Sequence, residues 1–173
     1  LGYEVTILKE GQLVGEATIV YTNDSPSEAW PGGTYKNYLR VYLPSDVVKI
    51  TVKEQGQNQP DFKPLVKESL ERQEEFGKSV FGFLVEVPAK ESKKIKITFQ
   101  REEKLLLSAN SLDYIFFCQK QSGTGQDPLV VKINYPAFLK PVKIMPQGTW
   151  EIQKVTLKSE LDKDKLFAVE FNH

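Results

Sequence analysis

The chain has 173 residues, of which 40% are hydrophobic and 27% are charged, a balance typical of a single ordinary globular domain. Its 23 basic and 23 acidic residues cancel to a net charge of zero, whereas proteins that bind nucleic acid or an anionic membrane surface usually carry a basic excess. The single cysteine and single histidine exclude an internal disulfide and any metal site built from several such ligands.

Alternation of hydrophobic and polar residues predicts β-strands through most of the chain. Residues 3–22 are expected to form a hairpin with its turn at residues 9–12. A loop containing proline and glycine follows over residues 23–34. Two further strands are then expected over residues 35–43 and 48–53.

Residues 54–78 interrupt this pattern, because they are polar and contain proline. Pro64 is suited to the first turn of a helix and Gly77 to its end, so a long polar excursion that is helical in part is expected here. Such a helix would bury only a thin apolar stripe, since Val66 and Leu70 are its apolar pair four residues apart.

The strand pattern resumes at residue 81, and residues 112–120 are apolar on both faces, which favours a central strand covered on both sides. In total, roughly nine or ten strands alternate with turns. The sequence therefore predicts an all-β fold, namely an antiparallel, immunoglobulin-like β-sandwich that forms one domain over residues 1–173. Phe83 and Phe116 are expected in its core.

No spacing of residues in the sequence points to catalysis. Histidine is the usual general base, and His173 is the last residue of the chain. Cys118 lies in an apolar segment and is expected to be a small buried hydrophobic residue. Residues 23–25 fit the N-glycosylation pattern, which matters only in a eukaryotic secretory setting. We therefore predict that the domain is not an enzyme and has no catalytic residues, no metal site and no cofactor.

The most distinctive loop segment is Ala-Trp-Pro-Gly-Gly-Thr-Tyr at residues 29–35. We expect the indole to fold back against one end of the sandwich, because large aromatic side chains tend to bury. The alternative is an exposed ring that contacts a ligand. A second loop, at residues 121–128, offers glycine flexibility and polar groups. Because recognition residues gather in the loops of rigid scaffolds, the candidate binding residues are Trp30, Tyr35, Tyr38, Gln121 and Thr124.

Three blocks of the sequence resemble a known bacterial family. The first combines Tyr-Thr-Asn-Asp-Ser-Pro at residues 21–26, Trp-Pro-Gly-Gly-Thr-Tyr at 30–35 and Asn-Tyr-Leu-Arg-Val-Tyr-Leu-Pro at 37–44. The others are residues 77–87, with a Val-Phe-Gly-Phe core, and residues 119–124, where serine replaces the proline of the family pattern. Together they resemble the C-terminal part of the domain of unknown function 4012 family.

Members of that family look like surface proteins anchored by an N-terminal transmembrane helix, so the resemblance implies an extracytoplasmic location and assigns no catalytic residues. The chain begins at Leu1 and its only methionine is Met145. We therefore expect a C-terminal part of a longer protein, with a membrane anchor outside this sequence. The expected function is a non-enzymatic structural or interaction module whose partner is an envelope protein or a glycan, and the alternative is a glycan-binding module that uses loop aromatics.

Overall fold

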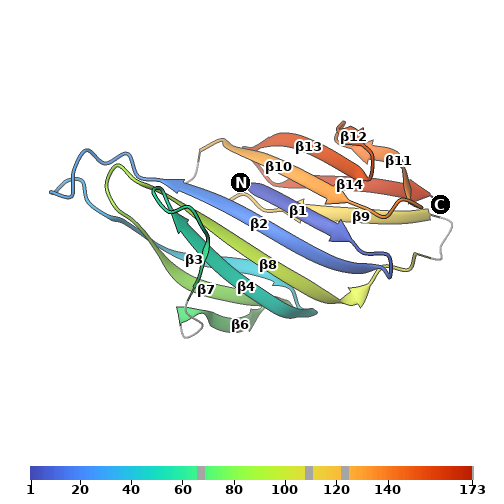
Figure 1. The fold of residues 1–173 in the computed structure, drawn as a ribbon, viewed down its shortest axis with the longest axis horizontal. Coiled ribbons are helices and arrows are strands. Elements are labelled where there is room, and N and C mark those ends of the chain that lie inside the picture. The colour runs from blue at the N-terminus through green and yellow to red at the C-terminus, as the bar shows by residue number, and fades with distance from the viewer. Residues whose placement is uncertain (66–68, 108–110, 122–124, 173) are drawn as a thin grey trace. The chain divides into compact units, whose positions relative to one another are not determined.

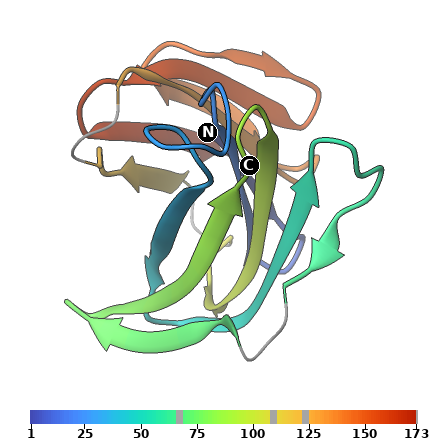
Figure 2. The same cartoon turned by 90° about the vertical axis from the view of Figure 1, so that its left-hand side faces the viewer.

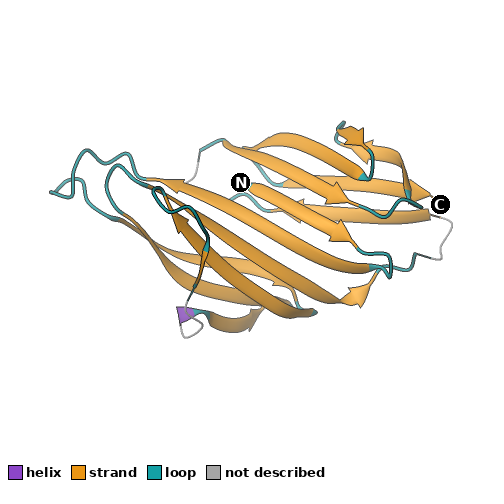
Figure 3. Cartoon of the chain, viewed as in Figure 1, coloured by secondary structure: helices purple, strands orange, loops and turns teal. Residues whose placement is uncertain are grey.

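The computed structural model of the chain describes residues 1–65, 69–107, 111–121 and 125–172. Within these ranges the protein is all-β, as the alternation predicts, and the single helical turn lies at Ser69 (Figure 3). The described sheets are mainly antiparallel, with one parallel pair between the first and tenth strands. No described helix is long and apolar enough to cross a membrane.

Fourteen strands are described (Figure 1). In chain order they are β1 (Gly2–Ile7), β2 (Gln12–Thr22), β3 (Tyr35–Pro44), β4 (Val47–Gly56), β5 (Lys63–Pro64), β6 (Glu71–Glu75), β7 (Lys78–Val87), β8 (Ser92–Lys104), β9 (Ser111–Cys118), β10 (Asp127–Asn134), β11 (Lys140–Met145), β12 (Thr149–Glu151), β13 (Lys154–Leu161) and β14 (Lys165–Asn172).

Contacts within the chain divide it into two compact units. Unit 1 comprises Leu1–Ala17 and Glu102–His173, and unit 2 comprises Thr18–Arg101. Strands β2 and β8 each run from one unit into the other. Whether the whole chain folds as one domain stays a prediction.

Unit 1 contains the strands β12, β13, β10 and β1 in that order, and a separate sheet with the order β11-β14-β9. Alternate residues of these strands point inward, as their period-two patterns require. They share one hydrophobic core, whose fully buried members include Val5, Leu129, Val131, Ile133, Val155, Leu157, Phe167, Val169 and Phe171.

Strand β9 is not the central strand that its composition predicts. It lies at an edge of the β11-β14-β9 sheet and pairs only with β14 among the described strands. Leu112 and Tyr114 face the core, whereas more than half of the surface of Ile115 and of Phe117 is exposed. Phe116 is only partly buried, where it stacks on the ring of Tyr3 at a centroid distance of 4.0 Å. Apolar residues on both faces of a strand therefore do not establish that both faces are covered.

Unit 2 contains an antiparallel sheet with the order β3-β7-β6, together with β4 and its antiparallel neighbours β8 and β5. The short strand β5 lies beside β4 (Figure 2). Phe83 is buried, as predicted, with 1% of its surface exposed. Among its described residues, the other buried hydrophobic ones are Leu39, Leu43, Val47, Val52, Val80, Phe81, Val85, Val87, Ile95, Ile97 and Phe99.

The polar excursion over residues 54–78 contains the strands β5 and β6, so a helix that runs from Pro64 to Gly77 is wrong for the described residues, among which only Ser69 is helical. Strand β6 pairs with β7 through a two-residue turn at Phe76 and Gly77, whose φ angles are 51° and 68°. Positive φ at both turn positions is typical of the type I′ hairpin. Backbone hydrogen bonding to a neighbour forms the strand here, although its side chains are polar and mostly exposed.

Candidate functional site

The loop between β2 and β3 is fastened to the turn between β7 and β8 by one buried amide. The side-chain nitrogen of Asn23 donates to the backbone oxygens of Gly33 and Val87, both at 2.9 Å. The backbone of Asn23 donates to the oxygen of Glu91 and accepts from the N–H of Lys90. Since both amide protons are used and the side chain is buried, Asn23 serves the fold and is not presented as a glycosylation acceptor.

A second brace comes from Glu28, in the middle of the same loop. Its carboxylate accepts hydrogen bonds from the backbone N–H of Ala89 and, at 2.9 Å, from the hydroxyl of Thr34. The Ala89 N–H, followed by the Thr34 hydroxyl, holds the pKa of the Glu28 carboxyl below its ordinary value. The loop is also tightly folded, because a Cβ at Gly32 would lie 2.5 Å from the backbone oxygen of Ser27.

Trp30 projects from this braced loop into solvent, with 92% of its surface exposed. The expectation that the indole folds back as a plug is therefore wrong and the ring is exposed, while its contact with a ligand stays a prediction. The physical reason is that the loop is held by polar contacts of Asn23 and Glu28, not by packing of the large aromatic side chain. A fixed loop with a solvated indole is suited to contacting another molecule.

Tyr35 and Tyr38, two further predicted candidates, lie on opposite faces of β3. Tyr35 packs near the ring of Tyr21, with a centroid distance of 6.1 Å. The hydroxyl of Tyr21 accepts a hydrogen bond from the side chain of Asn37 at 3.2 Å, and burial raises the pKa of this tyrosine. The sequence thus named both tyrosines as candidates, but in the structure they lie on opposite faces of the sheet and do not form one site.

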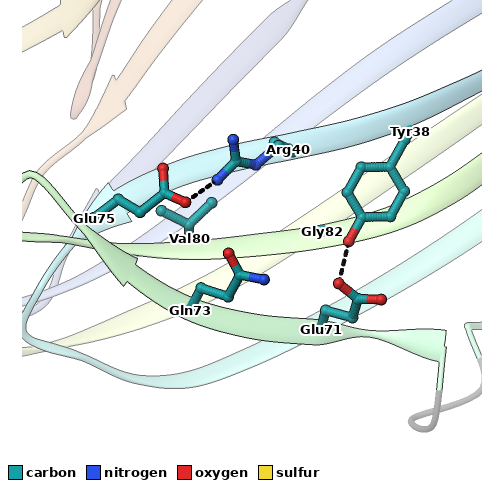
Figure 4. Close-up of a pocket in the computed structure, with 7 residues that line it drawn as sticks. All are labelled: Tyr38, Arg40, Glu71, Gln73, Glu75, Val80 and Gly82. Carbon is teal, nitrogen blue, oxygen red and sulfur yellow. Dashed lines mark hydrogen bonds and ion pairs between the residues drawn. The ribbon is translucent and has the colours of Figure 1, made fainter.

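Tyr38 belongs to a polar surface that we call the tyrosine face. It is the side of the β3-β7-β6 sheet formed by Tyr38, Arg40 and Tyr42 of β3, Val80 and Gly82 of β7, and Glu71, Gln73 and Glu75 of β6. All of these except Tyr42 line a hollow of about 340 Å³ (Figure 4). Alternate residues of a strand point to the same face of the sheet, so residues two apart on each of the three strands meet at one site.

Cross-strand contacts hold the polar side chains of the tyrosine face in place. The Tyr38 hydroxyl donates to Glu71, which raises the pKa of Tyr38 (Figure 4). Arg40 forms an ion pair with Glu75, and the Tyr42 hydroxyl donates to the other oxygen of that carboxylate at 3.0 Å. The Arg40 guanidinium lies 5.3 Å from the centroid of the Tyr42 ring, within the range of a cation–π contact.

Gly82 shapes the floor of the hollow. A Cβ at this position would lie 2.8 Å from Cζ of Tyr38, so the tyrosine ring lies directly against the glycine backbone. Because Gly82 has no side chain, the ring extends across β7 and its hydroxyl reaches Glu71 on β6. The hollow therefore depends on glycine at this one position.

The remaining predicted candidates belong to unit 1. Gln121 is exposed, and its backbone oxygen accepts a hydrogen bond from the side chain of Lys120 at 3.1 Å. Thr124 lies outside the described residues. Cys118 is half-buried against the core, and burial raises the pKa of its thiol, which disfavours the reactive thiolate. Among the described residues, no group of three or more His, Cys, Asp or Glu side chains could hold a metal ion.

Sequence reasoning missed most of the tyrosine face. It named Tyr38 but not Arg40 or Tyr42, although these residues alternate on one face of a predicted strand. It also missed the contribution of Glu71–Glu75, which lies within the expected excursion. The alternation on β3 was an available signal, whereas the pairing of β6 with β7 was not.

Comparison with known proteins gives no family for this chain. No protein-family model matches it, and no curated protein matches it. Among solved structures, a zinc metallopeptidase of the M1 class from Deinococcus radiodurans aligns with 99% of this chain at 11% identity and a TM-score of 0.37. A mutant of that enzyme bound to a Tyr-Ser-Ala substrate aligns at 10% identity and a TM-score of 0.36. The chain spans 40% of the length of the first of these proteins, and likeness at this level supports no functional conclusion.

Proposed function

We propose that this chain is a non-enzymatic interaction module of a bacterial surface protein, located outside the cytoplasm and tethered through a membrane anchor that lies beyond this sequence. The resemblance of residues 21–44, 77–87 and 119–124 to an anchored surface family supports this location. The strand-rich fold supports the finer proposal of an immunoglobulin-like sandwich, a scaffold that presents recognition loops at its ends.

The observation that carries the proposal is the solvent-exposed indole of Trp30 on a braced loop. Large aromatic side chains bury roughly 150–250 Å² when covered, which at about 25 cal/mol per Å² corresponds to roughly 4–6 kcal/mol. Tryptophan is also among the residues that most often dominate binding interfaces. A partner that covers the exposed Trp30 side chain therefore gains a large favourable contribution to its binding free energy.

The hydrogen bonds of Asn23 and Glu28 that hold the loop also favour binding. Asn23 ties the loop to Val87, and Glu28 ties it to Ala89, so the chain around Trp30 is ordered before any partner arrives. A preorganised loop loses less conformational entropy on binding than a mobile one.

Trp150 provides a matched control, since it is the other tryptophan of the chain and is 64% exposed. Immobilised wild-type domain, Trp30→Ala and Trp150→Ala are to be incubated with bacterial envelope extract. We expect a partner that is retained by the wild type and by Trp150→Ala but lost with Trp30→Ala. Equal retention by all three proteins, or no retention by any, would contradict the proposed role of Trp30.

Fluorescence offers a direct reading of the same contact. A Trp150→Phe variant leaves Trp30 as the single tryptophan, and its emission should shift to shorter wavelength when a partner covers the indole. Emission that stays unchanged while the partner binds would place recognition elsewhere on the domain.

A second candidate function, glycan binding, is favoured by the two tyrosines and the hollow of the tyrosine face. Sugar recognition requires exposed aromatic rings beside polar groups that fix orientation. Tyr38 and Tyr42 both lie on this face and are partly exposed.

A further inference from the structure

We propose that the tyrosine face binds a neutral carbohydrate, with one sugar ring seated in the hollow beside Tyr38. The inference rests on the second candidate function, which it narrows to one class of glycan, and it is independent of the Trp30 loop, since none of its residues belongs to that loop. It assigns a ligand class to a site that lies entirely within unit 2.

The shape of the hollow suits a small ring. Its volume of about 340 Å³ lies near the lower end of the range for small-molecule sites. Val80, whose side chain is buried, and Gly82 form the floor, and neither contributes a polar side chain. Tyr38 and Arg40 border the floor from β3, and Glu71, Gln73 and Glu75 border it from β6 (Figure 4).

The tyrosine rings supply surfaces for the C–H groups of a sugar. Tyr38 lies against Gly82 on one side and still has 47% of its surface exposed. The face of an aromatic ring is slightly negative, and the C–H groups along one side of a pyranose are slightly positive, so stacking is favourable. Tyr42 follows four residues later on the same face, roughly 13 Å along the strand, and offers a second ring to an extended glycan.

The polar groups suit hydroxyls, which both donate and accept hydrogen bonds. Glu71 and Glu75 present acceptors, and Arg40 presents donors. Gln73 presents both, and within the described part of the chain its amide has no hydrogen-bond partner. A sugar hydroxyl would supply that partner from inside the hollow.

The charge of the hollow favours a neutral ligand. Arg40 is already paired with Glu75, whereas the carboxylate of Glu71 contacts the neutral hydroxyl of Tyr38 and forms no ion pair among the described residues. A uronate, sulfate or phosphate would therefore meet net repulsion. A neutral glycan would meet none, so the site is expected to reject anionic polymers.

The test uses saturation-transfer NMR on the full chain with defined oligosaccharides. Cellohexaose, xylohexaose and chitohexaose are the neutral probes, and a galacturonic acid hexamer is the anionic probe. We expect saturation transfer to at least one neutral probe and none to the anionic one. Transfer to no neutral probe, or stronger transfer to the anionic probe, overturns the proposal.

Tyr35 supplies a matched control for Tyr38. The two tyrosines share β3 and are 46% and 47% exposed, but they lie on opposite faces. Tyr38→Ala should weaken binding of the neutral probe about ten-fold, whereas Tyr35→Ala should leave it unchanged. Equal losses in both variants, or no loss in either, would show that the tyrosine face is not the site.

Gly82→Ala tests the hollow without removing any polar group. Its φ does not lie in the left-handed region, and the atoms that a new Cβ would meet belong to the flexible side chain of Tyr38. The variant should therefore fold, as its thermal unfolding will show, while Tyr38 is displaced and binding falls about ten-fold. Full binding by a folded Gly82→Ala protein would refute seating in the hollow.

Trp30→Ala separates this inference from the proposed function. It should leave binding of the neutral probe unchanged, because Trp30 does not line the hollow. Sugar binding lost on Trp30→Ala but retained in Tyr38→Ala would overturn the inference and leave recognition through the Trp30 loop intact. Loss of partner capture with sugar binding retained in Trp30→Ala supports both.

Discussion

Replacing Asn23 with alanine should both destabilise the domain and release the Trp30 loop. The side chain makes three hydrogen bonds, in which it donates to the backbone oxygens of Gly33 and Val87 and accepts from the N–H of Ser25. At about 1 kcal/mol for each net hydrogen bond, the loss comes to about 3 kcal/mol. The free energy lost also includes the penalty for leaving the backbone oxygen of Val87 without a donor, because its hydrogen bond with Asn23 is buried.

Urea denaturation measures the free energy of unfolding, and digestion with a glutamate-specific protease measures loop release through cleavage after Glu28. Asn23→Ala should lose about 3 kcal/mol and be cut at Glu28 far faster than the wild type. Asn37→Ala is the control, since its amide makes one hydrogen bond, to the hydroxyl of Tyr21, and should cost about 1 kcal/mol. A loss below about 1 kcal/mol at Asn23, with Glu28 still resistant, would refute the view that this amide braces the loop.

Three further predictions concern the core, the loop and the β6–β7 turn. Phe83→Ala should cost roughly 3–5 kcal/mol in chemical denaturation, because its side chain is fully buried; a loss under about 1 kcal/mol would show that the residue is not part of a packed core. The pKa of Glu28 lies below its ordinary value of 4.5, so its bracing should be complete above that pH and be lost as the pH falls through the lowered pKa. Trp30 emission in the Trp150→Phe background should follow this loss, and Glu28→Gln should abolish the pH dependence. Gly77→Ala should cost about 1 kcal/mol, since its φ of 68° is strained for alanine although a Cβ would meet nothing within 4 Å; an unchanged free energy of unfolding would argue against the type I′ turn.

The sequence by itself determined the all-β class and most of the inward-facing residues. Phe81, Phe83, Val85 and Val87 alternate along one segment, and all are buried in β7. Alternation is a local property, because successive side chains of any strand point to opposite faces. A strand that buries one face can therefore be recognised from its sequence, whichever strand it pairs with.

The same reasoning failed where pairing, not composition, makes a strand. Residues 71–75 read Glu-Arg-Gln-Glu-Glu and show no hydrophobic period, yet they form β6 through backbone pairing with β7. Conversely, Ile115 and Phe117 look buried in sequence but are exposed, because they lie on the face of β9 that points away from the core. Neither outcome is encoded in a single segment.

Both candidate sites were decided by tertiary contacts between distant residues. Trp30 is exposed because Asn23 binds a backbone oxygen 64 residues away and Glu28 binds an N–H 61 residues away. The hollow exists because Tyr38 crosses Gly82 to reach Glu71, 33 residues along the chain. Hydrogen bonds between residues so far apart in the sequence depend on which strands become neighbours. The packing of the whole sheet settles that strand order. Residue spacing along the chain could therefore identify Trp30 and Tyr38 as candidates, but it could not predict the residues around them.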